Sequence, residues 1–167
     1  MCRRVFTCMA LLVLLATSSG IVRAQEELAG TSDYLLSAQA FKDYMLQCAG
    51  CHRFDGQGMP QRGVPDFRNS IGLFTRLGAG REYMIRVPGS SQSQLNNADL
   101  ARVLNWIVAM YSPQDIKQDY RPFTSAEVGA SRARPYDDVV QARKALTAEL
   151  RARGLEPAVY TFGSINE

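Results

Sequence analysis

The sequence predicts an all-α fold, and the spacing of its apolar side chains is the main evidence. Apolar residues recur every three to four positions over residues 34–48, over residues 100–111 and over residues 139–150. This spacing places them on one face of an α-helix. The first of these patterns runs directly into the segment Cys48-Ala49-Gly50-Cys51-His52. We therefore expect a helical protein that is organised around this short segment.

Residues 1–24 have the features of an export signal. The segment begins with a pair of arginines, continues with an apolar run over residues 5–16 and ends with small residues that a signal peptidase accepts. The apolar run is too short to span a bilayer comfortably. We expect cleavage after Ala24, with a site near Gly20 as second choice and an uncleaved anchor as the alternative. The expected location is the periplasm.

Loss of the signal changes both the cysteine count and the charge. Cys2 and Cys8 leave with it, so Cys48 and Cys51 remain, directly before His52, the single histidine of the chain. The signal also holds three of the 19 basic residues, so 16 basic side chains face 16 acidic ones in the mature protein. A neutral chain gives no basis for binding nucleic acid or an anionic membrane.

The C-x-x-C-H spacing is the signature of covalent c-type haem attachment. Two thiols three positions apart lie within about one helical turn and can add across the two vinyl groups of a haem. The histidine that follows is then the proximal iron ligand. A redox C-x-x-C pair is the alternative, but the adjoining histidine favours haem. We expect one covalently attached haem c, held by Cys48, Cys51 and His52.

Further elements can be expected in chain order. A turn-rich loop with two glycines and a proline follows the motif, and short helices are expected over residues 71–77 and 81–86. The second of these stops before Pro88, and a polar loop follows over residues 90–94. The clearest helix has Asn97 as its expected N-cap and runs to Tyr111.

Residues 112–167 form a C-terminal extension, so the expected organisation is a signal (1–24), a main domain (25–111) and this extension. Thr124 and Glu127 have the spacing of a capping box. A further helix is expected from about Asp137. Its apolar stripe consists of Val139, Ala142, Leu146 and Leu150.

Over residues 34–111 the sequence resembles the class I (mono-haem) c-type cytochromes. The resemblance rests on an early C-x-x-C-H motif after a helix, on the loop Asp55-Gly56-Gln57-Gly58, on a proline-bearing loop and on a last helix with an aromatic residue. It implies a class I cytochrome c-like helical fold around one haem, in which the first and last core helices cross. The expected contributors to this crossing are Phe41, Tyr44, Trp106 and Ile107.

The resemblance also implies a partner for the proximal histidine. In this family that histidine donates its second ring N–H to a proline carbonyl, which fixes the imidazole plane and tunes the iron. Pro65 is the candidate for this role, and Pro60 is the alternative.

The sixth iron ligand of the family is usually a methionine before the last helix, and a thioether favours reduced iron. Met84 has this position, although it lies farther from the last helix than is usual and inside an apolar run. Met59 and Met110 are alternatives, as is an iron with no methionine ligand. Bis-histidine ligation within the chain is excluded because His52 is the single histidine.

Arginine is enriched between residues 53 and 86, where six arginines stand against three acidic residues. A solvated surface is one explanation. The other is that one or two arginines pair with haem propionates and that the rest steer an acidic partner. Arg81, directly after Gly80, is the candidate for a propionate contact.

The resemblance implies a periplasmic one-electron carrier between a dehydrogenase or quinol-oxidising complex and a terminal acceptor. Such a protein needs no catalytic residues beyond the iron ligands. One alternative is a haem subunit bound permanently to a periplasmic oxidoreductase, because the stripe of the extension must be buried against something. A gas-binding or sensor haem protein is a third. We expect periplasmic redox proteins as partners, no nucleic acid and no stable membrane span after cleavage.

Overall fold

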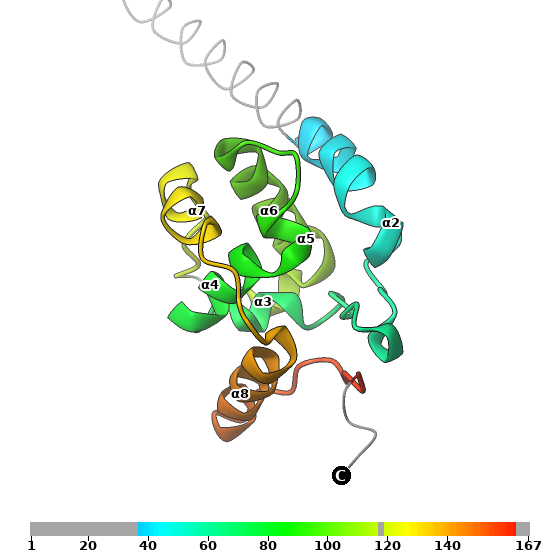
Figure 1. Cartoon of the computed structure of the whole chain (residues 1–167). Coiled ribbons are helices and arrows are strands. Elements are labelled where there is room, and N and C mark those ends of the chain that lie inside the picture. Colours follow the sequence, from blue (N-terminus) through cyan, green and yellow to red (C-terminus); the bar gives the residue numbers. More distant parts are fainter. Residues whose placement is uncertain (1–36, 117–118, 163–167) are drawn as a thin grey trace, which may run out of the picture. The chain divides into compact units, whose positions relative to one another are not determined.

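The computed structural model describes residues 37–116 and 119–162 (Figure 1). The chain divides into two compact units, Met1–Ala38 and Gln39–Glu167, and almost all described residues belong to the second. The expected signal peptide lies outside the described residues. Within the described residues all regular secondary structure is helical, apart from a single bridge between Met59 and Val64. The prediction of an all-α fold is therefore confirmed.

The helices follow the order that their apolar patterns predict. Residues 37–47 are helical and lead into the haem motif. The elements after them are α2 (Ala49–His52), η1 (Pro60–Arg62), α3 (Ile71–Phe74), α4 (Gly78–Arg86), α5 (Pro88–Ser91), α6 (Asn97–Tyr111), η2 (Pro113–Asp115), α7 (Ser125–Arg132) and α8 (Val139–Ala152). The turn α5 occupies the start of a segment expected to be a loop, because Pro88 suits the first position of a helix. None of the described helices has the length and apolar content needed to cross a bilayer.

Side-chain caps begin the three longer helices of the second half. The amide oxygen of Asn96 accepts from the backbone N–H of Asp99 at 2.9 Å and starts α6. Asn97 was the expected cap, and this prediction is wrong by one position because Asn97 is already helical while Asn96 has extended backbone angles. Thr124 and Asp138 cap α7 and α8 in the same way.

The helix over residues 37–47 packs on α6 through aromatic side chains. The ring of Trp106 lies 5.8 Å from that of Phe41 and 5.1 Å from that of Tyr44. Tyr44 is fully buried, and Ile107 is 4% exposed. The predicted contact between the first and last core helices is therefore confirmed. This contact holds the end of the first helix, and thus the haem motif, against α6.

The C-terminal extension packs onto this helical core. Helix α7 packs against α4 and α6, and α8 packs against α3 and α4 (Figure 1). Leu146 and Leu150 of the expected stripe are buried, as are Phe123 and Val128. Asn105 of α6 fastens the segment before α7, since its amide accepts from Phe123 N at 2.7 Å and donates to Phe123 O at 3.0 Å.

Arginines of the core bind backbone carbonyls of the extension. Arg76 donates to the carbonyl of Asp115 at 2.9 Å. Arg86 donates to the carbonyl of Arg134, and its guanidinium lies 3.9 Å from the centre of the Tyr136 ring. These contacts account for part of the arginine enrichment and show that the extension and the core form one folded body.

Candidate haem-binding site

The haem motif opens onto a cavity of about 420 Å³ inside the second unit. The motif forms one end of this cavity, while α4, α6 and α8 form much of the rest. Most of the lining side chains are apolar, among them Val64, Phe67, Ile71, Leu100, Leu104 and Ile107. Such a site excludes water from a flat, largely apolar ligand and leaves few polar groups to orient it.

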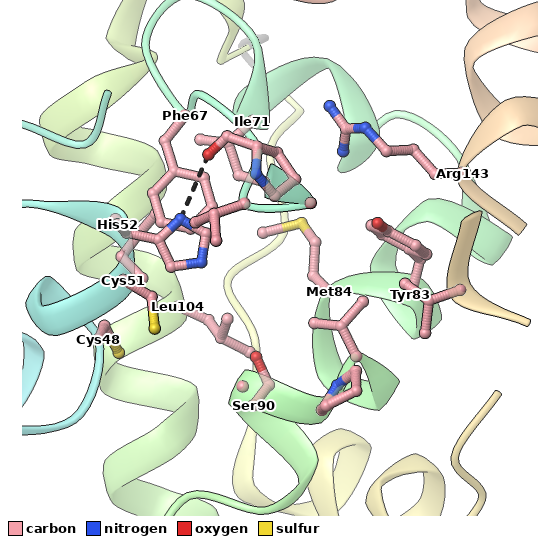
Figure 2. A pocket seen from close by; sticks show the side chains of 18 of the residues that line it. Cys48, Cys51, His52, Phe67, Ile71, Tyr83, Met84, Ser90, Leu104 and Arg143 are labelled. Carbon is pink, nitrogen blue, oxygen red and sulfur yellow. Dashed lines mark hydrogen bonds between the residues drawn. The ribbon is translucent and has the colours of Figure 1, made fainter. Parts of the chain in front are cut away.

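The single turn α2 brings both thiols and the imidazole to the cavity. The backbone N–H groups of Cys51 and His52 both donate to the carbonyl of Cys48, at 3.2 and 2.9 Å. Both cysteines are free thiols and line the cavity beside His52 (Figure 2). Burial raises the pKa of the Cys48 thiol to about 11, and the charge of Asp43 adds to this effect. Cys48 is therefore a protonated thiol, the form that supplies both S and H to a vinyl group.

The His52 ring is held by a hydrogen bond and by a stacking contact. Its Nδ1 lies 3.3 Å from the carbonyl oxygen of Pro65, and the Phe67 ring stacks on it with 3.9 Å between ring centres. A carbonyl only accepts, so Nδ1 carries the proton and Nε2 keeps its lone pair. Burial lowers the pKa of His52 to about 4, although the bond to Pro65 opposes this shift. The imidazole is thus neutral, as an iron ligand must be.

Gly58 allows the Pro65 carbonyl to reach His52. Its φ of +62° lies in the left-handed region, and its N–H donates to the carbonyl of His52 at 3.0 Å. A Cβ at this position would lie 2.4 Å from the carbonyl oxygen of Pro65. The second glycine of the loop after the motif is therefore required by both the backbone conformation and the close approach.

Of the three candidate methionine ligands, the structure brings Met84 to the cavity. Met84 lies on α4, is 3% exposed and lines the cavity wall (Figure 2). Met59 pairs its backbone with Val64 and does not line the cavity. Met110 lies on α6 with 54% of its surface exposed.

The connection between α4 and α6 contains neither methionine nor histidine over residues 87–96. Ser90 of α5 lines the cavity. Arg132 of α7 fixes this connection, because its guanidinium donates to the carbonyls of Ser91, Ser93 and Leu95. One wall of the cavity is therefore held in place by the extension.

Arg81 does not face this cavity, which corrects the expectation of a propionate contact at this position. Its buried guanidinium donates two hydrogen bonds to the Glu127 carboxylate, at 2.7 and 2.6 Å, and one to the carbonyl of Arg121 at 2.7 Å. It also lies 4.0 Å from the centre of the Phe123 ring. All three guanidinium nitrogens are thus used to anchor the extension.

Sequence reasoning missed Arg143, which lines the cavity from α8. This residue is 3% exposed, and its guanidinium lies 4.9 Å from the centre of the Phe74 ring and 4.8 Å from that of Tyr160. One signal was available in the sequence: position 143 precedes Leu146 and Leu150 by three and seven residues and so belongs to the apolar face of α8.

Two curated proteins, both named cytochrome c-552 and both from Thermus thermophilus, are similar to this chain. The first is 32% identical over an alignment of 118 positions, which covers 60% of this chain and 78% of the relative. The second is 32% identical over an alignment of 106 positions, which covers 53% of this chain and 80% of the relative. No family model matches the chain.

Proposed function

Because the chain belongs to the cytochrome c family, we propose that it is a periplasmic mono-haem electron carrier. Proteins of this family carry covalently bound haem c and transfer electrons. In the proposed role the protein accepts one electron from a dehydrogenase or quinol-oxidising complex and passes it to a terminal acceptor. The expected export signal over residues 1–24 supports the periplasmic assignment.

The observation that supports this proposal best is the donor set of the cavity. Two thiols, a neutral imidazole and a thioether, from Cys48, Cys51, His52 and Met84, line one largely apolar space (Figure 2). Its volume of about 420 Å³ lies within the range of about 300–1,000 Å³ that is typical of small-molecule and cofactor sites. These residues fit a covalently attached haem.

Each residue has a distinct part in the proposal. The thiols of Cys48 and Cys51 attach the haem through its two vinyl groups, and Nε2 of His52 is the proximal ligand. The carbonyl of Pro65 holds the His52 ring and makes it a stronger donor. The thioether of Met84 is the distal ligand and favours the reduced iron. The haem, when bound, supplies the one-electron iron chemistry.

The first test is the charge-transfer band of sulfur-ligated ferric haem, at about 695 nm. We expect this band in the oxidised wild-type protein and its loss in Met84→Ala. The control is Met110→Ala, which removes an exposed methionine outside the cavity and should keep the band. A band that survives Met84→Ala would overturn the assignment of Met84.

A second measurement separates a carrier from a ligand-binding protein. If His52 and Met84 both bind the iron, the reduced wild type should bind carbon monoxide only weakly at neutral pH and should titrate reversibly with one electron. Met84→Ala should open the distal position and bind carbon monoxide readily. Absence of the charge-transfer band in the wild type, together with tight carbon monoxide binding, would instead favour a sensor or gas-binding haem protein.

A further inference from the structure

Arg143 has an unusual environment for a charged side chain. It is 3% exposed, it lies against the rings of Phe74 and Tyr160, and it lines the same cavity as His52. Its buried Nε has no hydrogen-bond partner. In the described part of the chain no carboxylate forms an ion pair with it. The guanidinium is therefore a buried positive charge without a counter-ion among these residues.

The neighbouring polar groups do not neutralise this charge. The Tyr83 hydroxyl lies close to Arg143, as Figure 2 shows. A phenol hydroxyl is a dipole that can donate or accept a hydrogen bond, and it is not a counter-ion for a guanidinium. An uncompensated buried charge is costly, and a guanidinium meets a carboxylate with planar, charge-assisted hydrogen bonds. The site therefore fits a ligand that carries a carboxylate group into the cavity.

The position of Arg143 matches one particular carboxylate. In a haem the two propionates lie at the edge opposite the two vinyl groups. Attachment to Cys48 and Cys51 directs the vinyl edge to their end of the cavity. Arg143 lies at the other end, well separated from both sulfurs (Figure 2). A propionate of a haem attached in this way is therefore the carboxylate that comes towards the guanidinium.

We propose that Arg143 binds a haem propionate, which makes the C-terminal extension a structural part of the haem site. This inference rests on the proposed haem attachment. Helix α8 is fixed by Leu146 and Leu150, which are buried on the same face as Arg143, so the guanidinium is held in place before the carboxylate arrives. A fixed positive charge at the propionate favours the reduced iron, because reduction adds one negative charge to the haem.

Arg62 is the other arginine that lines the cavity, and it offers an alternative partner for the propionates. Its side chain is exposed, so water screens its charge and a contact there is weak. Arg143 is the stronger candidate, because its side chain is buried and its Nε has no hydrogen-bond partner.

The test uses the full chain with its haem attached and compares Arg143→Gln, Arg143→Lys and Arg62→Gln with the wild type. Arg151→Gln is the matched control, since Arg151 lies on the same helix but is exposed and outside the cavity. Covalent haem is quantified from the pyridine haemochrome spectrum. The two readouts are the reduction potential and the propionate bending vibration in the resonance Raman spectrum, which responds to hydrogen bonding at the carboxylate.

We expect Arg143→Gln to lower the reduction potential and to shift the propionate vibration. Arg143→Lys should restore part of the potential, because the charge is kept, while the vibration stays shifted, because the planar pair of donors is lost. Arg62→Gln and Arg151→Gln should leave both readouts near the wild-type values. If Arg143→Gln does not fold, the test rests on Arg143→Lys, whose propionate vibration should be shifted from that of the wild type.

Two results would overturn the inference. One is an unchanged vibration in the Arg143 variants while haem is fully attached. The other is a lowered potential and shifted vibration in Arg62→Gln instead. Failure of the proposed function itself is distinguishable, because wild-type protein without covalent haem gives no haemochrome spectrum once non-covalent haem has been extracted with acidified acetone.

Discussion

Substitution of Gly58 by alanine tests how the loop after the haem motif controls His52. The new methyl group would lie 2.4 Å from the carbonyl oxygen of Pro65 and 2.6 Å from that of Val64. Both neighbours are backbone atoms, which cannot rotate away as a flexible side chain would. The segment over residues 64–65 therefore has to move, and with it the carbonyl that binds Nδ1 of His52.

The magnitude follows from two contributions. An L-residue in the left-handed region costs roughly 1–2 kcal/mol, and overpacking against a rigid neighbour adds roughly 1–3 kcal/mol. We expect Gly58→Ala to lower the free energy of unfolding by about 3 kcal/mol. Gly154→Ala is the matched control: Gly154 has a φ of +72°, but a Cβ there meets no atom within 4 Å. This control should cost only about 1 kcal/mol.

The assay is urea unfolding of the oxidised protein with its haem attached, followed by far-ultraviolet circular dichroism, together with the reduction potential of each variant. A weaker Pro65–His52 hydrogen bond makes the imidazole a poorer donor to the iron. Gly58→Ala should therefore raise the reduction potential, while Gly154→Ala leaves it unchanged. Equal destabilisation by the two substitutions would refute the close approach, and an unchanged potential in Gly58→Ala would refute the tuning of His52 by Pro65.

Two further predictions concern the extension. Glu127→Gln should lower the free energy of unfolding at pH 7 by about 2 kcal/mol, because the buried Arg81 loses its carboxylate. Arg81 holds the pKa of Glu127 below its usual 4.5, so this stabilisation is present at neutral pH and is lost as the pH falls through the folded-state pKa. Urea unfolding curves at several pH values check this. A stability difference between wild type and Glu127→Gln that grows in acid would contradict it. Leu150→Ala should cost about 3 kcal/mol, because Leu150 is fully buried. A cost in urea unfolding below about 1 kcal/mol would show that α8 is not part of the folded core.

The parts of the site that the sequence predicted are those that local spacing determines. The spacing of Cys48, Cys51 and His52 dictates that one helical turn presents all three side chains together. The helices followed from their apolar periodicity for the same reason. The resemblance implies a proline carbonyl beside the proximal histidine, with Pro65 as candidate and Pro60 as alternative, and the carbonyl of Pro65 does lie beside His52. Its role in tuning the iron stays a prediction.

The arginines could not be assigned from the sequence, because their roles depend on contacts between distant segments. Arg81 follows a glycine near the haem loop, yet its carboxylate partner Glu127 is 46 residues away. Arg143 lies 91 residues after His52 in the sequence. The two side chains line one cavity because α8 packs on α3 and α4. In the sequence, a buried arginine of this kind can be recognised only as a charged residue at an apolar position of a helix, as Arg143 is in α8.

The fold also bears on why the chain has an extension at all. The apolar stripe of α8 must be buried against something, and burial against a permanently bound oxidoreductase is one way to meet this need. Leu146 and Leu150 are buried within the same compact unit, however, so this stripe is no evidence for a partner. The extension instead fixes the connection before α6 through Arg132 and brings Arg143 into the cavity. Residues 87–96 are too poor in ligating side chains to complete a haem site unaided, and the extension supplies both a support for that wall and a charge inside it.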